Sequence, residues 1–381
     1  MREWGKMRKS LSTLMLLILL VGSFGLAFRI EAATPAQYFR PHDESPTGYF
    51  TLFKNLCDAH PGQADYVSIG KSYLGKDIWM FRIGNPNGGR ICWTAAIHGW
   101  EDMGTEVMYL YAKWLLETNS TETNNILSNN YALLIPIVNV DRLAKNNANY
   151  SSCSIGVNLL RNFPTKWSYV SCAQGEANND YHGPSPLSES EAIAVHSVFE
   201  TYRPIFYLDA HYGGGGVTGT GMCYSTIAQP NGSYVGKPMA NEFITKYRDL
   251  AKTHGVPSYW FSMNAPASGF PSTDANALGA TALLLEVAGE SPSGGLCYNH
   301  EAPGQSLEDI QTFWFPKCLP IFLAMNLLSA PNHTLPDLVT FARAYGSKPN
   351  DANWNSNCDL NNDGQVNLGD LMILATARAK N

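Results

Sequence analysis

The segment His98-Gly99-Trp100-Glu101 combines two side chains that bind metal ions. An imidazole and a carboxylate three residues apart in one loop can hold the same ion. Zinc catalysis in proteins uses three protein ligands and leaves a fourth position open for water. A third ligand and a general base must therefore come from elsewhere in the chain.

Two residues far downstream fit these roles. His211 ends the apolar run Ile205–Ala210 and precedes four glycines, which suits a third ligand, although taken alone it fits a core histidine better. Glu286 lies in the apolar run Thr281–Val287, where a carboxylate is costly unless it has a partner or a function. A water molecule on the metal would be such a partner, and a buried ion pair is the alternative.

The surrounding pattern predicts how these residues are positioned. Apolar runs predict strands, and amphipathic segments predict helices, in alternation along the chain: strands within 67–81, 91–97, 131–140, 204–210 and 281–287, and helices after Glu101 and at 188–199, 241–254 and 310–328. Such alternation indicates an α/β fold with a mixed, mostly parallel central β-sheet and helices on both faces. Residues at the carboxyl ends of strands are where open α/β sheets bind ligands.

Taken together, these residues resemble the zinc metallocarboxypeptidases of the carboxypeptidase A type. The resemblance runs from about Tyr38 to Leu328. Five segments carry it in order: His98–Glu101, Gly156–Phe163, Tyr181–Glu189, Asp209–His211 and Leu285–Glu286. It implies a metallopeptidase that hydrolyses C-terminal residues from peptides or proteins, using water activated by zinc.

The resemblance also assigns roles around the metal. His98, Glu101 and His211 would hold one zinc ion, and Glu286 would act as the general base. Asn158 would orient a ligand histidine. An arginine would stabilise the oxyanion, and its interval to Cys153 favours Arg142, with Lys145 as the second choice.

Substrate recognition is implied by two further positions. Arg161 matches the arginine that binds the terminal carboxylate, for which a guanidinium fork is well shaped. The same alignment places Thr273 or Ser272 near the floor of the specificity pocket, where both are polar and uncharged. The type of side chain preferred there is therefore left open.

Two departures from the family keep other functions in view. Leu160 stands where the family has an asparagine beside the arginine, and the family tyrosine before the general base is absent at the aligned place. A related zinc amidase or endopeptidase, acting on cell-wall or other peptides, is one alternative. A non-catalytic peptide-binding module is another, and the presence of Glu286 argues against it.

The last fifty residues form a different kind of segment. After a linker that contains Pro331 and Pro336, the loop Asp359–Asp370 has the spacing of a calcium loop. Its expected ligands, at loop positions 1, 3, 5, 7 and 12, are Asp359, Asn361, Asp363, Gln365 (through its carbonyl) and Asp370. The segment resembles a dockerin repeat, which predicts a small α-helical, EF-hand-like domain over 331–381 with one calcium ion. The domain would bind a cohesin-like or cell-surface partner. The alternative is a solvated turn that binds no metal.

The start of the chain has the layout of a signal peptide. A basic beginning precedes an apolar run over residues 11–27 and small residues at Ala32 and Ala33. We expect residues 1–33 to be removed, the protein to be secreted, and 34–330 to form the catalytic domain. An uncleaved membrane anchor is the alternative, because the run approaches the lower length limit of a spanning helix.

Composition agrees with a well-packed globular protein. The chain has 381 residues, of which 45% are hydrophobic and 15% charged, so it can form a large core. Eight cysteines suggest disulfides outside the cytoplasm, and the short Cys153–Cys172 interval is the favoured pair. The net charge is −6 and no basic stripe is present, so nucleic acid is not an expected partner.

Overall fold

The computed structural model describes residues 40–99, 101–141, 157–167, 181–212, 222–226, 238–256, 260–262, 269–287, 306–330, 338–355, 358–360 and 363–378. The predicted signal peptide, the linker and the Cys153–Cys172 pair lie outside these residues. Within them, no helix combines the length and the apolar character needed to cross a membrane.

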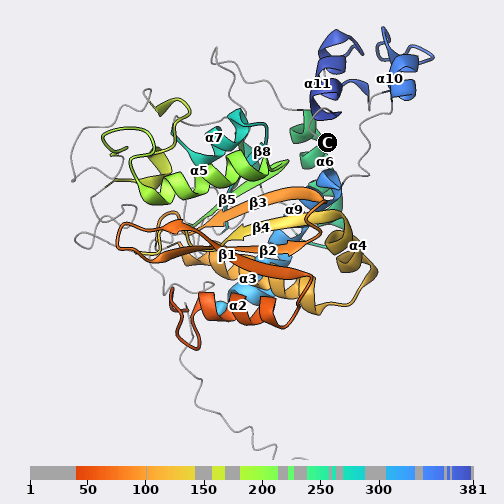
Figure 1. Ribbon diagram of the computed structural model, residues 1–381. Helices are drawn as coiled ribbons and strands as arrows, with labels where there is room; N and C mark the ends of the chain where they lie inside the picture. Colours follow the sequence, from red (N-terminus) through yellow and green to blue (C-terminus); the bar gives the residue numbers. More distant parts are fainter. Residues whose placement is uncertain are drawn as a thin grey trace, which may run out of the picture. The chain divides into compact units, whose positions relative to one another are not determined.

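The described part contains one mixed β-sheet (Figure 1). In spatial order its strands are β1 (Ala64–Lys71), β2 (Asp77–Gly84), β4 (Asn130–Ile135), β3 (Gly89–Ala95), β5 (Phe206–His211), β8 (Thr281–Glu286), β6 (Met222–Thr226) and β7 (Trp260–Ser262). The central strands β4, β3, β5 and β8 are parallel, whereas β1, β2 and β6 join by antiparallel pairing. The predicted mixed α/β sheet is confirmed.

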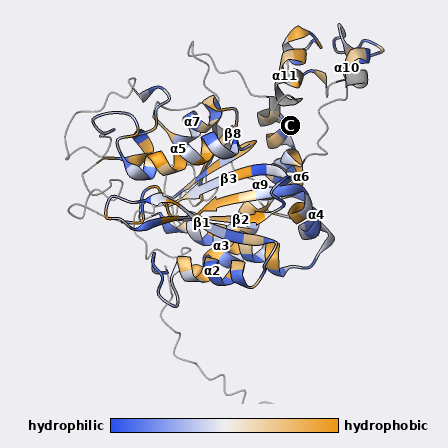
Figure 2. Cartoon of the chain, viewed as in Figure 1, coloured by the Kyte–Doolittle hydropathy of each residue, from blue (hydrophilic) through white to orange (hydrophobic). Residues whose placement is uncertain are grey.

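Helices cover both faces of this sheet (Figure 1). On one face lie α2 (Tyr49–Asp58), α3 (Asp102–Glu117) and α9 (Phe315–Ser329), and on the other lie α5 (Ser190–Tyr202) and α7 (Pro271–Ala277). Figure 2 shows that α2 and α5 each carry hydrophobic and hydrophilic residues, as expected for helices with one face on a core. Helix α9 is buried over most of its length.

An aromatic cluster and a glycine bind α3 to the sheet. The ring of Trp93 on β3 lies 5.8 Å from the ring of Tyr111 on α3 and 4.2 Å from that of Phe322 on α9. Gly104 on α3 packs so closely that a Cβ there would lie 2.8 Å from the Cβ of Ala210 on β5. The first turn of α3 is therefore held directly against the strand that ends in His211.

Some elements differ from the prediction. The strand expected over 131–140 ends at Ile135, because Pro136 has no N–H for the ladder. Beyond it, the backbone N–H of Val138 donates to the carbonyl oxygen of Ala95 at 3.1 Å. The prediction missed α4 (Thr121–Asn129), α7, β6 and β7. The expected helix at 310–328 is preceded by α8 (Leu307–Asp309) and begins as the π-helix η3 (Ile310–Trp314).

Cys57 and Cys92 are buried thiols outside any disulfide. Burial raises the pKa of Cys57 to about 12 and raises that of Cys92 further. Both side chains belong to the main hydrophobic core and act there as small apolar groups.

The C-terminal segment has its own small hydrophobic cluster. It contains α10 (Leu338–Ala344) and α11 (Leu368–Arg378). Its buried members are Phe341, Ala344, Cys358, Val366 and Leu374, and none of them belongs to the main core.

Candidate metal centre

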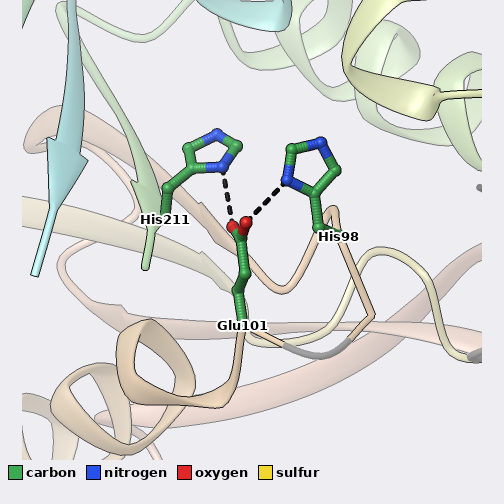
Figure 3. A group of neighbouring side chains, drawn as sticks. All are labelled: His98, Glu101 and His211. Atoms are coloured by element: carbon green, nitrogen blue, oxygen red, sulfur yellow. Dashed lines mark hydrogen bonds and ion pairs between the residues drawn. The ribbon is translucent and has the colours of Figure 1, made fainter. Parts of the chain in front are cut away.

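The side chains of His98, Glu101 and His211 meet at one point (Figure 3). The Nδ1 atoms of His98 and His211 each lie 2.8 Å from an oxygen of the Glu101 carboxylate. The two rings are 5.0 Å apart, and one ligand atom from each residue falls within 4.8 Å of the others. Two histidines 113 positions apart thus share one carboxylate.

The fold explains why these residues meet. Strands β3 and β5 are adjacent and parallel, so their carboxyl ends lie at the same edge of the sheet. His211 is the last residue of β5, whereas His98 follows β3 after Ala96, whose φ of 48° turns the chain. Glu101 caps α3, and its N–H donates to the carbonyl oxygen of His98 at 2.9 Å.

The first turn of α3, directly after Glu101, is braced by a preceding segment. The Arg40 guanidinium donates to the Glu106 carboxylate at 2.8 and 3.2 Å, and His42 contacts the carboxylate of Asp102. Asp102 and Glu106 are buried. These contacts fix the helix start and thereby the direction of the Glu101 side chain.

Each histidine of the cluster has a second partner on its other nitrogen. Nε2 of His98 lies 3.3 Å from Oδ1 of Asn158, which also accepts the backbone N–H of Leu160 at 3.0 Å. Nε2 of His211 lies 3.0 Å from Oδ2 of Asp209. Both partners are acceptors, so a proton on each Nε2 would leave each Nδ1 free to bind a metal beside Glu101.

This arrangement tests whether the residues fit a metal. Two imidazole nitrogens and two carboxylate oxygens converge, and with the protons on Nε2 a cation between them would offset the repulsion of their lone pairs. Two histidines and one glutamate are a donor set that zinc prefers in catalytic sites. The residues therefore fit zinc.

The electrostatics of the cluster point the same way. Burial alone would raise the pKa of Glu101, but the neighbouring His98 and His211 lower it to about 2. Burial lowers the pKa of His211, but Asp209 and Glu101 outweigh it and hold that pKa well above its usual value. The site thus stabilises positive charge beside an ionised carboxylate.

Glu286 lies beside this cluster. It is the last residue of β8, and it is the register partner of His211 on β5. Partners in register project their side chains to the same face of a sheet. Glu286 is half-buried, so it combines access to water with proximity to the cluster.

The predicted substrate residues lie on two segments that contact each other. Arg161 ends the short 3₁₀ helix η1 (Leu159–Arg161), and Thr273 is buried in α7. The N–H of Phe163 donates to the carbonyl oxygen of Gly269 at 2.9 Å, which joins the two segments. Asn158, at the start of η1, connects them to His98.

Arg142 lies outside the described residues, but the structure describes its neighbour Asp141. Oδ1 of Asp141 accepts the Ser72 hydroxyl, and Oδ2 accepts the N–H of Leu74, both at 2.9 Å. Asp141 thus holds the turn between β1 and β2 at the edge of the sheet that carries the cluster.

In the C-terminal segment, one carboxylate oxygen each from Asp359, Asp363 and Asp370 lies within 4.8 Å of the others. Gly364 has a φ of 82°, the left-handed conformation expected at the tight turn. Burial raises the pKa of Asp359, and the charges of Asp370 and Asp363 add to this. Gln365 lies within the same loop, and Asn361 lies outside the described residues.

The sequence analysis missed the role of Asp209 and Thr94. The Thr94 hydroxyl donates to Oδ1 of Asp209 at 2.9 Å, and this leaves Oδ2 for His211. A signal was present, because residues two apart on a strand share a face and Asp209 is a carboxylate in an apolar run.

Comparisons with known proteins agree with this geometry. The family model described as zinc carboxypeptidase matches residues 50–255. Human carboxypeptidase A6 is 26% identical over 165 residues, covering 39% of this chain and 38% of the relative. Human carboxypeptidase O is 24% identical over 237 residues, covering 51% of this chain and 63% of the relative. The chain therefore spans less than two thirds of the length of these relatives.

A solved structure extends the likeness to the fold. The carboxypeptidase A of Helicoverpa armigera superposes with a TM-score of 0.57 at 18% identity, covering 74% of this chain and 72% of the other. The shared arrangement of sheet and helices thus persists although few residues are the same.

Proposed function

The chain belongs to the zinc carboxypeptidase family, and we propose that it is a zinc-dependent peptidase that removes residues from the carboxyl ends of peptides. The convergence of His98, Glu101 and His211 on one point, beside Glu286, carries the proposal. Three ligands and a neighbouring carboxylate are what hydrolysis by an activated water requires.

In this proposal each residue has one task. His98, Glu101 and His211 hold the zinc ion, while Asn158 and Asp209 keep the imidazoles oriented. Zinc, when bound, supplies Lewis-acid polarisation of the scissile carbonyl and lowers the pKa of a water molecule towards about 7. Glu286 would accept a proton from the attacking water and donate it to the leaving amine.

We assign substrate binding to Arg161, Thr273 and Arg142. Arg161 would pair with the terminal carboxylate, Thr273 would face the side chain of the departing residue, and Arg142 would stabilise the oxyanion. The junction between the η1 and α7 segments supports the first two assignments. Arg142 rests on its position in the sequence directly after Asp141.

Leu160 supports a second candidate, a zinc amidase or endopeptidase that acts on cell-wall or other peptides. An apolar side chain beside Arg161 removes a hydrogen bond that the resemblance leads us to expect at the carboxylate. A site with one fewer contact to a terminal carboxylate would discriminate less against an internal peptide bond.

We also propose that the C-terminal segment binds one calcium ion through Asp359, Asn361, Asp363, Gln365 and Asp370. The closeness of three carboxylates and the left-handed Gly364 support it. Attachment to a cohesin-like or cell-surface partner would be its function, and the basic and apolar start of the chain supports export.

The experiment is hydrolysis of a blocked dipeptide with a free C-terminus, compared with its C-terminal amide. Cleavage of the free acid alone is the expected result. Equal cleavage of both would favour the amidase or endopeptidase. No cleavage by zinc-loaded protein, across varied side chains, would leave a binding module. The Glu286→Gln variant is the control, and we expect its rate to be lower by about 10²–10⁴-fold with zinc still bound.

A further inference from the structure

An aromatic ring lies against the guanidinium of Arg161. The guanidinium carbon is 4.3 Å from the centre of the Phe270 ring, within the range of a cation–π contact. Phe270 is only 5% exposed and belongs to the main core, so the ring has a fixed position. A planar cation held on such a ring loses freedom to tilt, which fixes the plane of its N–H groups.

The backbone holds the two residues in this relation. The Phe163 N–H donates to the carbonyl oxygen of Gly269, and the Gly269 N–H donates to that of Thr165, both at 2.9 Å. Gly269 has a φ of 81°, and a Cβ there would lie 2.4 Å from the carbonyl oxygen of Arg161. These contacts join Gly269, directly before Phe270, to the segment that carries Arg161.

Asp274 on α7 adds a further contact between the two segments. Its Oδ1 accepts the Thr165 hydroxyl at 2.9 Å, and its Oδ2 lies 2.6 Å from Nδ1 of His196 on α5. Asp274 is buried, so both contacts are sheltered from water. Phe270 and Arg161 are therefore fixed relative to each other by three independent contacts on the same pair of segments.

We propose that Phe270 is a positioning residue that aims Arg161 at the terminal carboxylate of the substrate. The proposal rests on the proposed function. Its reason lies in Leu160, whose buried apolar side chain offers no hydrogen bond at the site. Stacking on Phe270 then supplies the orientation that makes one arginine sufficient for selecting a free C-terminus.

The test compares Phe270→Leu and Phe270→Tyr with the wild type on a free-acid peptide and its amide. We expect Phe270→Leu to raise KM for the free acid by about 3–30-fold, with kcat nearly unchanged. Its KM for the amide should not change. Phe270→Tyr retains an aromatic face and should restore the KM of the free acid. Phe313→Leu, at a ring that is 48% exposed on η3, is the matched control and should leave both substrates unaffected.

A purely structural role would give a different pattern. If Phe270→Leu changed both substrates equally, or if Phe270→Tyr failed to rescue, the proposal would be wrong. Zinc content and Tm, measured on each variant, separate loss of the fold from loss of selectivity.

Binding to the Glu286→Gln background separates this inference from the proposed function. Calorimetry with the free-acid peptide and the amide should show preference for the acid, and Phe270→Leu should reduce it. If that pattern holds while the wild type cleaves neither peptide, the function is wrong and the inference stands. If both peptides bind equally, or neither binds, the inference is overturned.

Discussion

The two predicted cation sites are built in opposite ways. His98, Glu101 and His211 are 8%, 4% and 2% exposed, and they stand at the edge of a buried parallel sheet. In the C-terminal loop, Asp363 is exposed while Asp359 and Asp370 are buried. The first site is therefore shaped by packing before any ion arrives, whereas the second brings like charges together within one short loop.

The hydrophobic cores beneath the two sites also differ, because one is much larger than the other. The cluster of His98, Glu101 and His211 rests on strands and helices that share one extensive core. Among the residues that the structure describes, the C-terminal loop rests on five buried hydrophobic residues. Since so few buried side chains stabilise a fold weakly, the C-terminal segment should depend on its ion, and the sheet should not.

The largest effect should come from removing a ligand of the preorganised site. We expect His211→Ala to weaken zinc binding well beyond the ~10–100-fold typical of second-shell changes, because the remaining two ligands cannot close the site. Its fold should persist. Competition with a chelating dye measures the affinity, and His254→Ala, an exposed histidine on the same chain, is the control. Unchanged zinc affinity in His211→Ala would show that His211 is not a zinc ligand.

The larger domain contains a buried lysine, Lys317, whose charge should reduce stability. Burial lowers the pKa of Lys317 on α9 from 10.5 to about 8. The unfolded chain therefore binds this proton more tightly, and the cost to stability is full below pH 8 and vanishes above 10.5. Lys317→Met should raise the free energy of unfolding at pH 7 by about 3 kcal/mol, and the gain should shrink as pH rises to 10.

Urea unfolding at the two pH values measures this gain, with the exposed Lys252→Met as the control. A gain of the same size at both pH values would show that the charge of Lys317 is not the cause.

Calcium removal should affect only the C-terminal segment. Calcium at 100 times its Kd would stabilise that segment by about 2.7 kcal/mol, so a chelator should accelerate amide exchange in α11. Asp370→Asn should mimic the chelator, whereas Asp351→Asn, an exposed carboxylate outside the loop, should not. Equal protection of α11 with and without calcium would mean that the loop needs no ion.

The smallest expected effect distinguishes the supports of the two histidines. Asp209→Asn should weaken zinc binding by about 10–100-fold, because a carboxylate that raises the basicity of His211 becomes a neutral amide. Asn158→Ala should weaken it less, since the amide of Asn158 is already neutral and lies 3.3 Å from His98. Dye competition on both variants gives the ranking, and the reverse order would contradict it.

Much of the fold could be predicted because the relevant signals are local. The apolar runs at β3, β5 and β8 each form a nearly continuous stretch, and His211 and Glu286 stand at their ends. Strand β7 has only three residues, and β6 follows a glycine-rich stretch, so neither produces a recognisable period. Helix α7 begins at Pro271 and has seven residues, too few for an amphipathic pattern.

The contacts that orient the site could not be predicted for a different reason. The hydrogen bond from Thr94 to Asp209 and the stacking of Arg161 on Phe270 each join residues more than a hundred positions apart. Local propensity carries no information about such pairs, which depend on strand order and on the contacts at Gly269. The acceptor behind His98, Asn158, likewise comes from a distant part of the chain.

The most direct test of the metal centre is an anomalous-scattering map at the zinc edge from crystals of zinc-loaded protein. The arrangement predicts one strong peak about 2.0–2.2 Å from Nδ1 of His98, Nδ1 of His211 and an oxygen of Glu101, with Glu286 facing it. A peak elsewhere, or none in fully loaded protein, would contradict the assignment of these three residues as the zinc ligands.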